Sequence, residues 1–297
     1  MKNLFTCICF TLITGAILQS CSTPDNPDDS VVAVNFTSGI KTRTQGPNWV
    51  DDDRIGIFVV KNGTSLQATN IVDGADNRQY KATAGASAQL SPVDDNQIIY
   101  YPDKGYVDFY AYYPFVPSDR LKDYKYSIDL SVQEDFSKID LLRAQVNNKD
   151  RNSPAVSLVF EHMLSKIIIN ITEGDGMEDY DFSQVSVSID GMSVTADLSL
   201  ADKSLSNLGA VSPISPAVVS QGVSYQAIVL PQGKAAGRSV KFSFSDRDFT
   251  WPVPDSDEIL AGKEYTWNLT VGKVGVTLSG ATIGEWGSGK ESNGSAN

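Results

Sequence analysis

The chain has 297 residues, and its 36 acidic residues outnumber its 24 basic residues, which gives a formal net charge of −12 at pH 7. A surface of this sign repels phosphate backbones, so the composition argues against nucleic acid as a partner. The chain has a single histidine, and its three cysteines, Cys7, Cys9 and Cys21, all lie within the first 21 residues, so the rest of the chain offers few ways to build a zinc site or a cysteine nucleophile. The length is sufficient for one large or two ordinary domains.

The first 20 residues have the features of an export signal. Lys2 precedes an apolar run over residues 4–17 that is too short to span a bilayer comfortably, and Leu18-Gln19-Ser20-Cys21 follows it. This tetrapeptide resembles a bacterial lipobox, which predicts removal of residues 1–20 as a lipoprotein signal peptide and lipidation of Cys21. An ordinary secretory signal is the alternative. Without the signal, 23 basic residues (24 less Lys2) face 36 acidic ones, and no free thiol remains.

Residues 21–30 are predicted to form a flexible acidic tether. After Cys21 they contain two prolines, three aspartates and no large apolar side chain, so they have nothing to bury. The acids between Asp25 and Asp29 resemble the surface-export signals of Bacteroidetes lipoproteins, although a merely well-solvated linker would have the same composition.

From residue 31 onward the dominant hydrophobic period is two, which is typical of β-strands. Residues 31–37 can place Val32, Val34 and Phe36 on one face of a strand. Further strands are expected over residues 54–60, 97–101, 106–113, 126–132, 155–160, 164–171, 185–189, 193–198, 223–230, 239–244, 248–253, 264–271 and 274–278. Residues 137–145 could form a short helix or a buried loop. Short strands between Gly, Pro, Asn and Asp turns predict an all-β chain of antiparallel sandwiches.

Gly174-Asp175-Gly176 is the clearest interruption of this pattern and predicts a domain boundary. We therefore expect an N-terminal β-sandwich domain over residues 31–173 and a C-terminal one over residues 174–283. Residues 284–297 are rich in Gly, Ser and Asn, with Trp286 as their one bulky apolar residue, and are expected to form a flexible tail.

Few residues are candidates for chemistry. His162 has no second imidazole with which to bind zinc, so it is expected to be a structural residue with a local hydrogen bond. Asp51-Asp52-Asp53 and Asp94-Asp95 lack the spacing of a calcium loop and are interpreted as turn acids. The aromatic run over residues 100–114 could stack on sugars, but alternation along a strand favours a core role. We expect no catalytic residue, no metal site and no cofactor, although composition leaves a glycosidase-like carboxylate pair open.

Several groups of residues occur in a characteristic order. They are Thr42-Arg43-Thr44, residues 49–58, Tyr100-Tyr101-Pro102, residues 107–114, residues 160–166, residues 229–232 and residues 261–271. Together they resemble the fimbrillin family of Bacteroidales, the FimA-like and Mfa-like pilins. The match covers nearly the whole mature chain. It departs from the family pattern at Asp53-Arg54, where the family usually has Gly-Asp.

The resemblance implies a precursor with two tandem transthyretin-like antiparallel β-sandwich domains, anchored at the cell outer membrane through Cys21. A trypsin-like protease would cut after Arg43 and leave Thr44 as the new N-terminus. The first strand, with Val32, Val34 and Phe36, would then leave, and a strand of another subunit would fill its groove by donor-strand exchange.

The function implied is that of a structural subunit of a surface fimbria that serves adhesion and biofilm formation. Its partners would be other fimbrial subunits, the lipoprotein export machinery, the processing protease and the outer membrane. Arg54 is a second candidate for the cleavage site. A tip or anchor subunit, or a surface glycan-binding lipoprotein, is the alternative, and an enzyme is not expected.

Overall fold

The computed structural model describes residues 31–41, 48–234 and 236–286. The predicted signal peptide and tether, with Cys21, lie outside these residues, and so do Arg43 and Thr44. Within the described ranges no helix is long and apolar enough to span a membrane.

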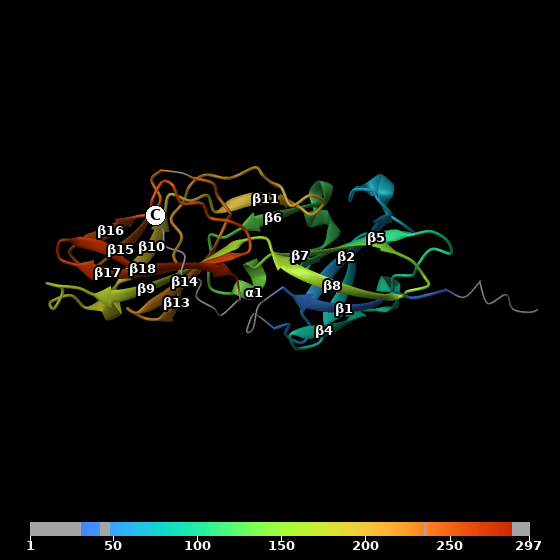
Figure 1. Ribbon diagram of the computed structural model, residues 1–297, viewed down its shortest axis with the longest axis horizontal. Coiled ribbons are helices and arrows are strands. Elements are labelled where there is room, and N and C mark those ends of the chain that lie inside the picture. Colours follow the sequence, from blue (N-terminus) through green and yellow to red (C-terminus); the bar gives the residue numbers. More distant parts are fainter. Residues whose placement is uncertain (1–30, 42–47, 235, 287–297) are drawn as a thin grey trace, which may run out of the picture. The chain divides into compact units, whose positions relative to one another are not determined.

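Seven strands of the first half form a closed hydrogen-bonded ring (Figure 1). Their order around the ring is β1-β4-β3-β2-β5-β7-β8. The strands are β1 (Asn35–Ile40), β2 (Arg54–Lys61), β3 (Arg78–Ala82), β4 (Ser87–Pro92), β5 (Val107–Tyr113), β7 (Leu142–Lys149) and β8 (Ala155–His162). Their inward side chains form one apolar core, to which β1 contributes Phe36 and the residue just before β1 contributes Val34.

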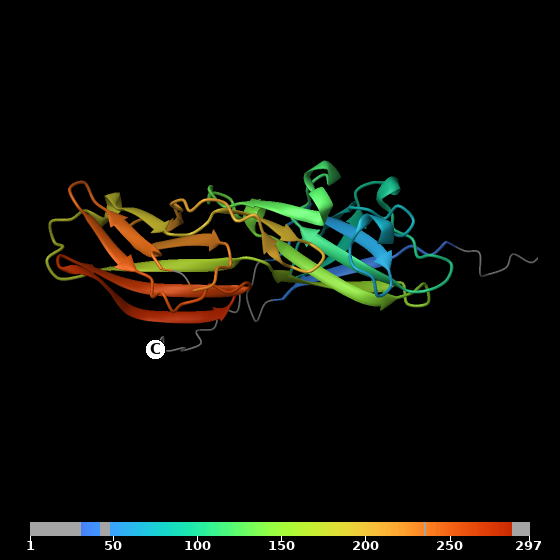
Figure 2. The same cartoon turned by 90° about the horizontal axis from the view of Figure 1, so that it is seen from above.

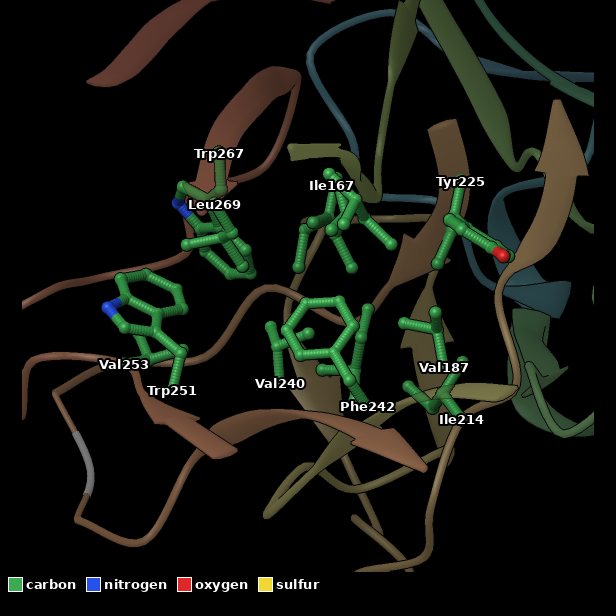
Figure 3. Close-up of a cluster of buried hydrophobic side chains, with 14 of the residues drawn as sticks. Ile167, Val187, Ile214, Tyr225, Val240, Phe242, Trp251, Val253, Trp267 and Leu269 are labelled. Carbon is green, nitrogen blue, oxygen red and sulfur yellow. The ribbon is translucent and has the colours of Figure 1, made fainter. Parts of the chain in front are cut away.

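Two sheets of the second half enclose a separate core. A five-stranded sheet has the order β13-β14-β9-β17-β18, and a three-stranded sheet has the order β10-β15-β16. The strands are β9 (Ser165–Glu173), β10 (Ser186–Asp190), β13 (Ala217–Ser220), β14 (Ser224–Val229), β15 (Ser239–Ser243), β16 (Asp248–Pro252), β17 (Lys263–Gly272) and β18 (Gly275–Glu285). Figure 2 shows β17 and β18, in red, alongside β9. In Figure 3, Val240 and Phe242 of one sheet face Ile167 of the other.

A third sheet joins strands from the two halves of the sequence. It has the order β12-β11-β6 and consists of β6 (Lys125–Asp129), β11 (Thr195–Ser199) and β12 (Leu205–Ser206). The third apolar core lies around it and contains both Phe58, from the ring, and Ile228, from β14. The helices in the described ranges are short: α1 (Phe136–Ile139) and the 3-10 turns η2 (Ala68–Asn70), η3 (Asp95–Gln97), η4 (Ser118–Arg120), η5 (Lys122–Tyr124) and η6 (Phe182–Gln184).

The all-β prediction is confirmed, but the expectation of purely antiparallel sheets is wrong. β1 runs parallel to β8, and β9 runs parallel to β17. Each parallel pair joins strands that are far apart in the sequence, and the intervening chain is long enough for the crossover that parallel pairing needs. The tandem transthyretin-like arrangement stays a prediction. The same holds for the domain boundary at residue 174, and we note that β9, which precedes it, pairs with β14 and β17.

Most predicted strands are present within a few residues of their expected bounds. The segment at residues 97–101 is an exception, because it contains the end of η3 and one isolated bridge from Tyr100 to Ala33. Residues 137–145 are divided between α1 and β7. Four strands, β3, β4, β12 and β13, were not predicted. All four are short, and β3, β4 and β12 contain several polar residues. At the other end, β18 continues to Glu285 and Trp286 is buried, although the sequence assigns both residues to the tail.

Candidate functional site

The first strand, β1, closes the ring between two strands that are not hydrogen-bonded to each other. On one side it pairs in parallel with β8, from Asn35 opposite Ala155 to Ile40 opposite Phe160. On the other side it pairs antiparallel with β4. Because β1 is the first strand of the described chain, one cut after it would separate it from all other strands. Its departure would expose the edges of β4 and β8 and open the ring.

Alternate side chains of β1 and of the residues just before it point into the core of the ring. Phe36 has no exposed surface, Val34 is 7% exposed and Val32 packs against the same core while partly buried. The Phe36 ring makes edge-to-face contacts with Tyr80 and Phe109, at centroid distances of 5.2 and 5.3 Å. The shared inward face that the sequence predicts for Val32, Val34 and Phe36 is therefore present. That this strand is removable stays a prediction.

Backbone hydrogen bonds extend the contact of the first strand toward its N-terminal side. The Val34 amide donates to the Ile99 carbonyl, and the Tyr101 amide donates to the Val32 carbonyl, both at 2.9 Å. Any strand that replaces β1 would meet these backbone groups as well.

Charged side chains mark the C-terminal end of β1. The Lys41 ammonium lies 3.1 Å from one oxygen of Glu161, and the Lys203 ammonium lies 2.8 Å from the other. The hydrogen bond from Lys203 and the proximity of both cations lower the pKa of Glu161. Lys41 is the last described residue before the segment that contains Arg43 and Thr44, both of which lie outside the described residues.

A cavity of about 390 Å³ lies beside this end of β1. Its lining includes Lys41, Glu161, Lys203 and His162. The His162 ring is stacked on Trp286, with centroids 4.1 Å apart, and its Nδ1 lies 2.9 Å from an Asp140 carboxylate oxygen. The histidine thus packs and makes a local hydrogen bond, which is the structural role predicted for it.

The acidic clusters act as turn residues. Asp51 accepts a hydrogen bond from the Ala84 amide, and Asp53 accepts one from the Val50 amide. Asp94 caps the 3-10 turn η3 by accepting from the Asn96 amide. Within the described ranges no group of three or more His, Cys, Asp and Glu side chains is placed to hold a metal ion.

The aromatic run belongs mainly to the cores. Every residue of β5 is buried, and the Tyr112 hydroxyl donates to the Asn77 side chain at 2.8 Å. Tyr100 and Tyr106, just before β5, are about half exposed. The core interpretation therefore holds for β5, and these two tyrosines are the ones whose rings reach solvent.

Sequence reasoning missed two parts of this site. The inward face continues to Ser38, which is 1% exposed, and β8 supplies Glu161 as the partner of Lys41. The alternation of residues 32–36 extends to residue 38 and could have identified Ser38. No local signal connects Lys41 to Glu161, which lies 120 residues away.

Comparison with known proteins identifies the family. Residues 42–286 match a protein family described as fimbrillin-like. The chain is 32% identical over 296 residues to Fim1C, a proposed fimbrium subunit of Bacteroides uniformis, and the match covers 94% of each protein. Another similar protein is a proposed cell adhesion protein of Bacteroides uniformis, whose crystal structure is 29% identical, has a TM-score of 0.72 and is matched over 88% of this chain and 99% of that one.

A more distant relationship supports the fold alone. The tip fimbrial protein Mfa3 of Porphyromonas gingivalis is 10% identical, with a TM-score of 0.52 over 86% of this chain and all of that one. Since the family match spans most of the residues and a relative of similar length exceeds 30% identity, the chain belongs to the fimbrillin-like family.

Proposed function

We propose that this protein is a structural subunit of a cell-surface fimbria and that it polymerises by donor-strand exchange after a protease removes β1. The observation that carries the proposal is the position of β1, which closes the ring and yet is the first strand of the described chain. Family membership supports a fimbrial, cell-adhesion role at the cell surface in association with other subunits. The family is one of structural subunits, which is not an enzyme class.

Burial supplies the driving force for exchange. Burial of the Val34 and Phe36 side chains stabilises the folded chain by about 3–6 kcal/mol in total, and the partly buried Val32 contributes less. Once β1 leaves, the same stabilisation becomes available to an incoming strand, together with the unpaired backbone groups of β4 and β8.

We assign processing to Arg43 and not to Arg54. Arg54 lies in β2, where its backbone pairs with Lys81 and its side chain forms an ion pair with Asp52 at 3.0 Å. Hydrogen-bonded strands resist the local opening that a protease needs. A cut after Arg43 leaves Thr44 at the new N-terminus and frees the whole of β1.

The precursor would reach the cell outer membrane through the lipoprotein export machinery and be held there by lipid on Cys21. Removal of residues 21–43 would release the subunit from this anchor and open its groove in one step. Assembled fimbriae would then serve adhesion and biofilm formation. An anchor subunit would instead keep its lipid and its first strand.

The proposal is tested by limited digestion of the full chain and of an Arg43→Ala variant with an arginine-specific protease, which spares Lys41. The parent should yield a product that begins at Thr44, and this product should form filaments visible by electron microscopy. Arg43→Ala should stay uncut in this segment and monomeric, whereas Arg54→Ala, the control, should behave like the parent. Filaments from Arg43→Ala with Arg54 also uncut would contradict strand exchange at this groove. A tip, anchor or glycan-binding role would then be the better explanation.

A further inference from the structure

Ser38 is a polar residue at an apolar position of β1. Its side chain is 1% exposed, and its hydroxyl has no hydrogen-bond partner among the described residues. It pairs with Ala88 of β4 on one side and with Leu158 of β8 on the other, and both of these side chains are buried. The two residues beside Ser38 on the neighbouring strands are therefore apolar, and neither side chain can accept or donate a hydrogen bond.

A buried hydroxyl without a partner weakens the strand that carries it. The hydroxyl is hydrated when the strand is free, and this hydration is lost when the strand enters the groove. The penalty corresponds to a factor of about 5 to 150 in an equilibrium constant. Gly39 follows directly and weakens the strand further, because glycine loses more backbone freedom than other residues on ordering.

The Phe36 position, in contrast to the Ser38 position, stabilises β1 in the groove. The ring is fully buried between Tyr80 and Phe109, both of which it contacts edge to face. Such a position accommodates a large aromatic or aliphatic side chain, whereas a small side chain would leave a cavity there. A large and a small subsite thus lie two residues apart along the groove.

We propose that the groove under β1 selects its replacement strand through these two subsites and that Ser38 makes β1 the weaker occupant. The preferred partner is a strand of a second subunit that runs parallel to β8. It carries a bulky apolar residue at the Phe36 position and a small apolar residue, such as alanine, at the Ser38 position. This inference rests on the proposed function, because it names the partner that strand exchange at this groove would favour.

Peptide competition on the full chain cut after Arg43 by an arginine-specific protease tests the selection. Fluorescent peptides of residues 31–41 would be compared as the parent sequence, Ser38→Ala, Phe36→Ala and, as the control on the exposed face, Thr37→Ala. Ser38→Ala should bind about 5 to 150 times more tightly than the parent peptide. Phe36→Ala should bind at least about 100 times more weakly. Thr37→Ala should stay within about twofold of the parent.

A second measurement uses the uncut chain, in which no exchange occurs. Ser38→Ala should raise the midpoint of thermal unfolding, whereas Thr37→Ala should leave it nearly unchanged. If the parent peptide enters the groove but Ser38→Ala binds no better, the selection is wrong. If no peptide enters and Ser38→Ala still stabilises the uncut chain, the weakness of β1 is upheld and strand exchange fails. If Ser38→Ala does not raise the midpoint of thermal unfolding of the uncut chain, the inference is overturned, regardless of the peptide affinities.

Discussion

At the scale of single residues, two glycines of the ring differ sharply in the space around them. A Cβ atom on Gly56, in β2, would lie 2.1 Å from the ring of Tyr112. That ring cannot move away easily, because its hydroxyl donates to Asn77 and accepts from the Val116 amide. A Cβ atom on Gly39, in β1, would meet only the Ala86 carbonyl, at an ordinary 3.6 Å.

Gly56→Ala should therefore destabilise the protein by about 3 kcal/mol or more, because β2 and β5 must separate to admit the methyl group. Gly39→Ala is the matched control in the same ring. It should stabilise by about 0.4–1 kcal/mol, because it lowers the entropy of the unfolded chain without strain. Urea unfolding of the two variants measures both effects, and a similar loss in both would show that the contact with Tyr112 is not the cause.

At the scale of elements, β18 is an edge strand held at its end by Trp286. The Trp286 amide donates to the Gly262 carbonyl at 2.9 Å, and its ring is 5% exposed and stacks on His162 at the end of β8. Lys263 and Glu285 add an ion pair between β17 and β18. The end of β18 is thus tied to a strand of the ring as well as to its own sheet.

Trp286→Ala should lower the free energy of unfolding by about 3–5 kcal/mol, because it removes a buried indole and leaves a cavity against His162. The amides at the end of β18 should also exchange hydrogen faster than in the parent. Val274→Ala, in the fully exposed turn between β17 and β18, is the control and should change neither quantity. Unchanged exchange in β18 after loss of the indole would show that pairing with β17 alone holds this strand.

At the scale of the whole molecule, the third apolar core and one glutamine connect strands from the two halves of the sequence. Gln133 is 4% exposed, and its amide group donates to the carbonyls of Leu130 and Ile228 at 2.8 and 3.0 Å. Its side-chain oxygen accepts from the Ile228 amide at 2.8 Å. The loop after β6 is thereby hydrogen-bonded to β14.

Gln133→Ala should destabilise the protein by about 1–3 kcal/mol, because it leaves backbone groups of Ile228 buried without these partners. It should also reduce cooperativity, so that calorimetry resolves two transitions where the parent shows one. The exposed Gln67→Ala is the control. A variant that loses stability but keeps a single transition would show that the third core alone couples the two halves.

Much of the local structure could be predicted from the sequence. The alternation of Val32, Val34 and Phe36 predicts their shared burial, because neighbouring strand residues point to opposite faces. The order of the motifs predicts the fimbrillin family, and the isolation of His162 predicts a structural role. The prediction of a strand over residues 97–101 is wrong: Ile99 and Tyr101 are buried there, but the segment contains only the end of η3 and a single bridge.

Sequence by itself determined the all-β class, the inward face of the first strand and the family, because each follows from short local patterns and, for the family, from their order along the chain. Only the tertiary structure decided that β1 runs parallel to β8, that β9 joins β14 and β17, and that Ser38 lies between Ala88 and Leu158. Strand pairing depends on contacts between residues that are distant in sequence, as Asn35 opposite Ala155 illustrates. The alternation of apolar and polar residues within a strand indicates which face is buried, but it does not indicate which strands pair with it.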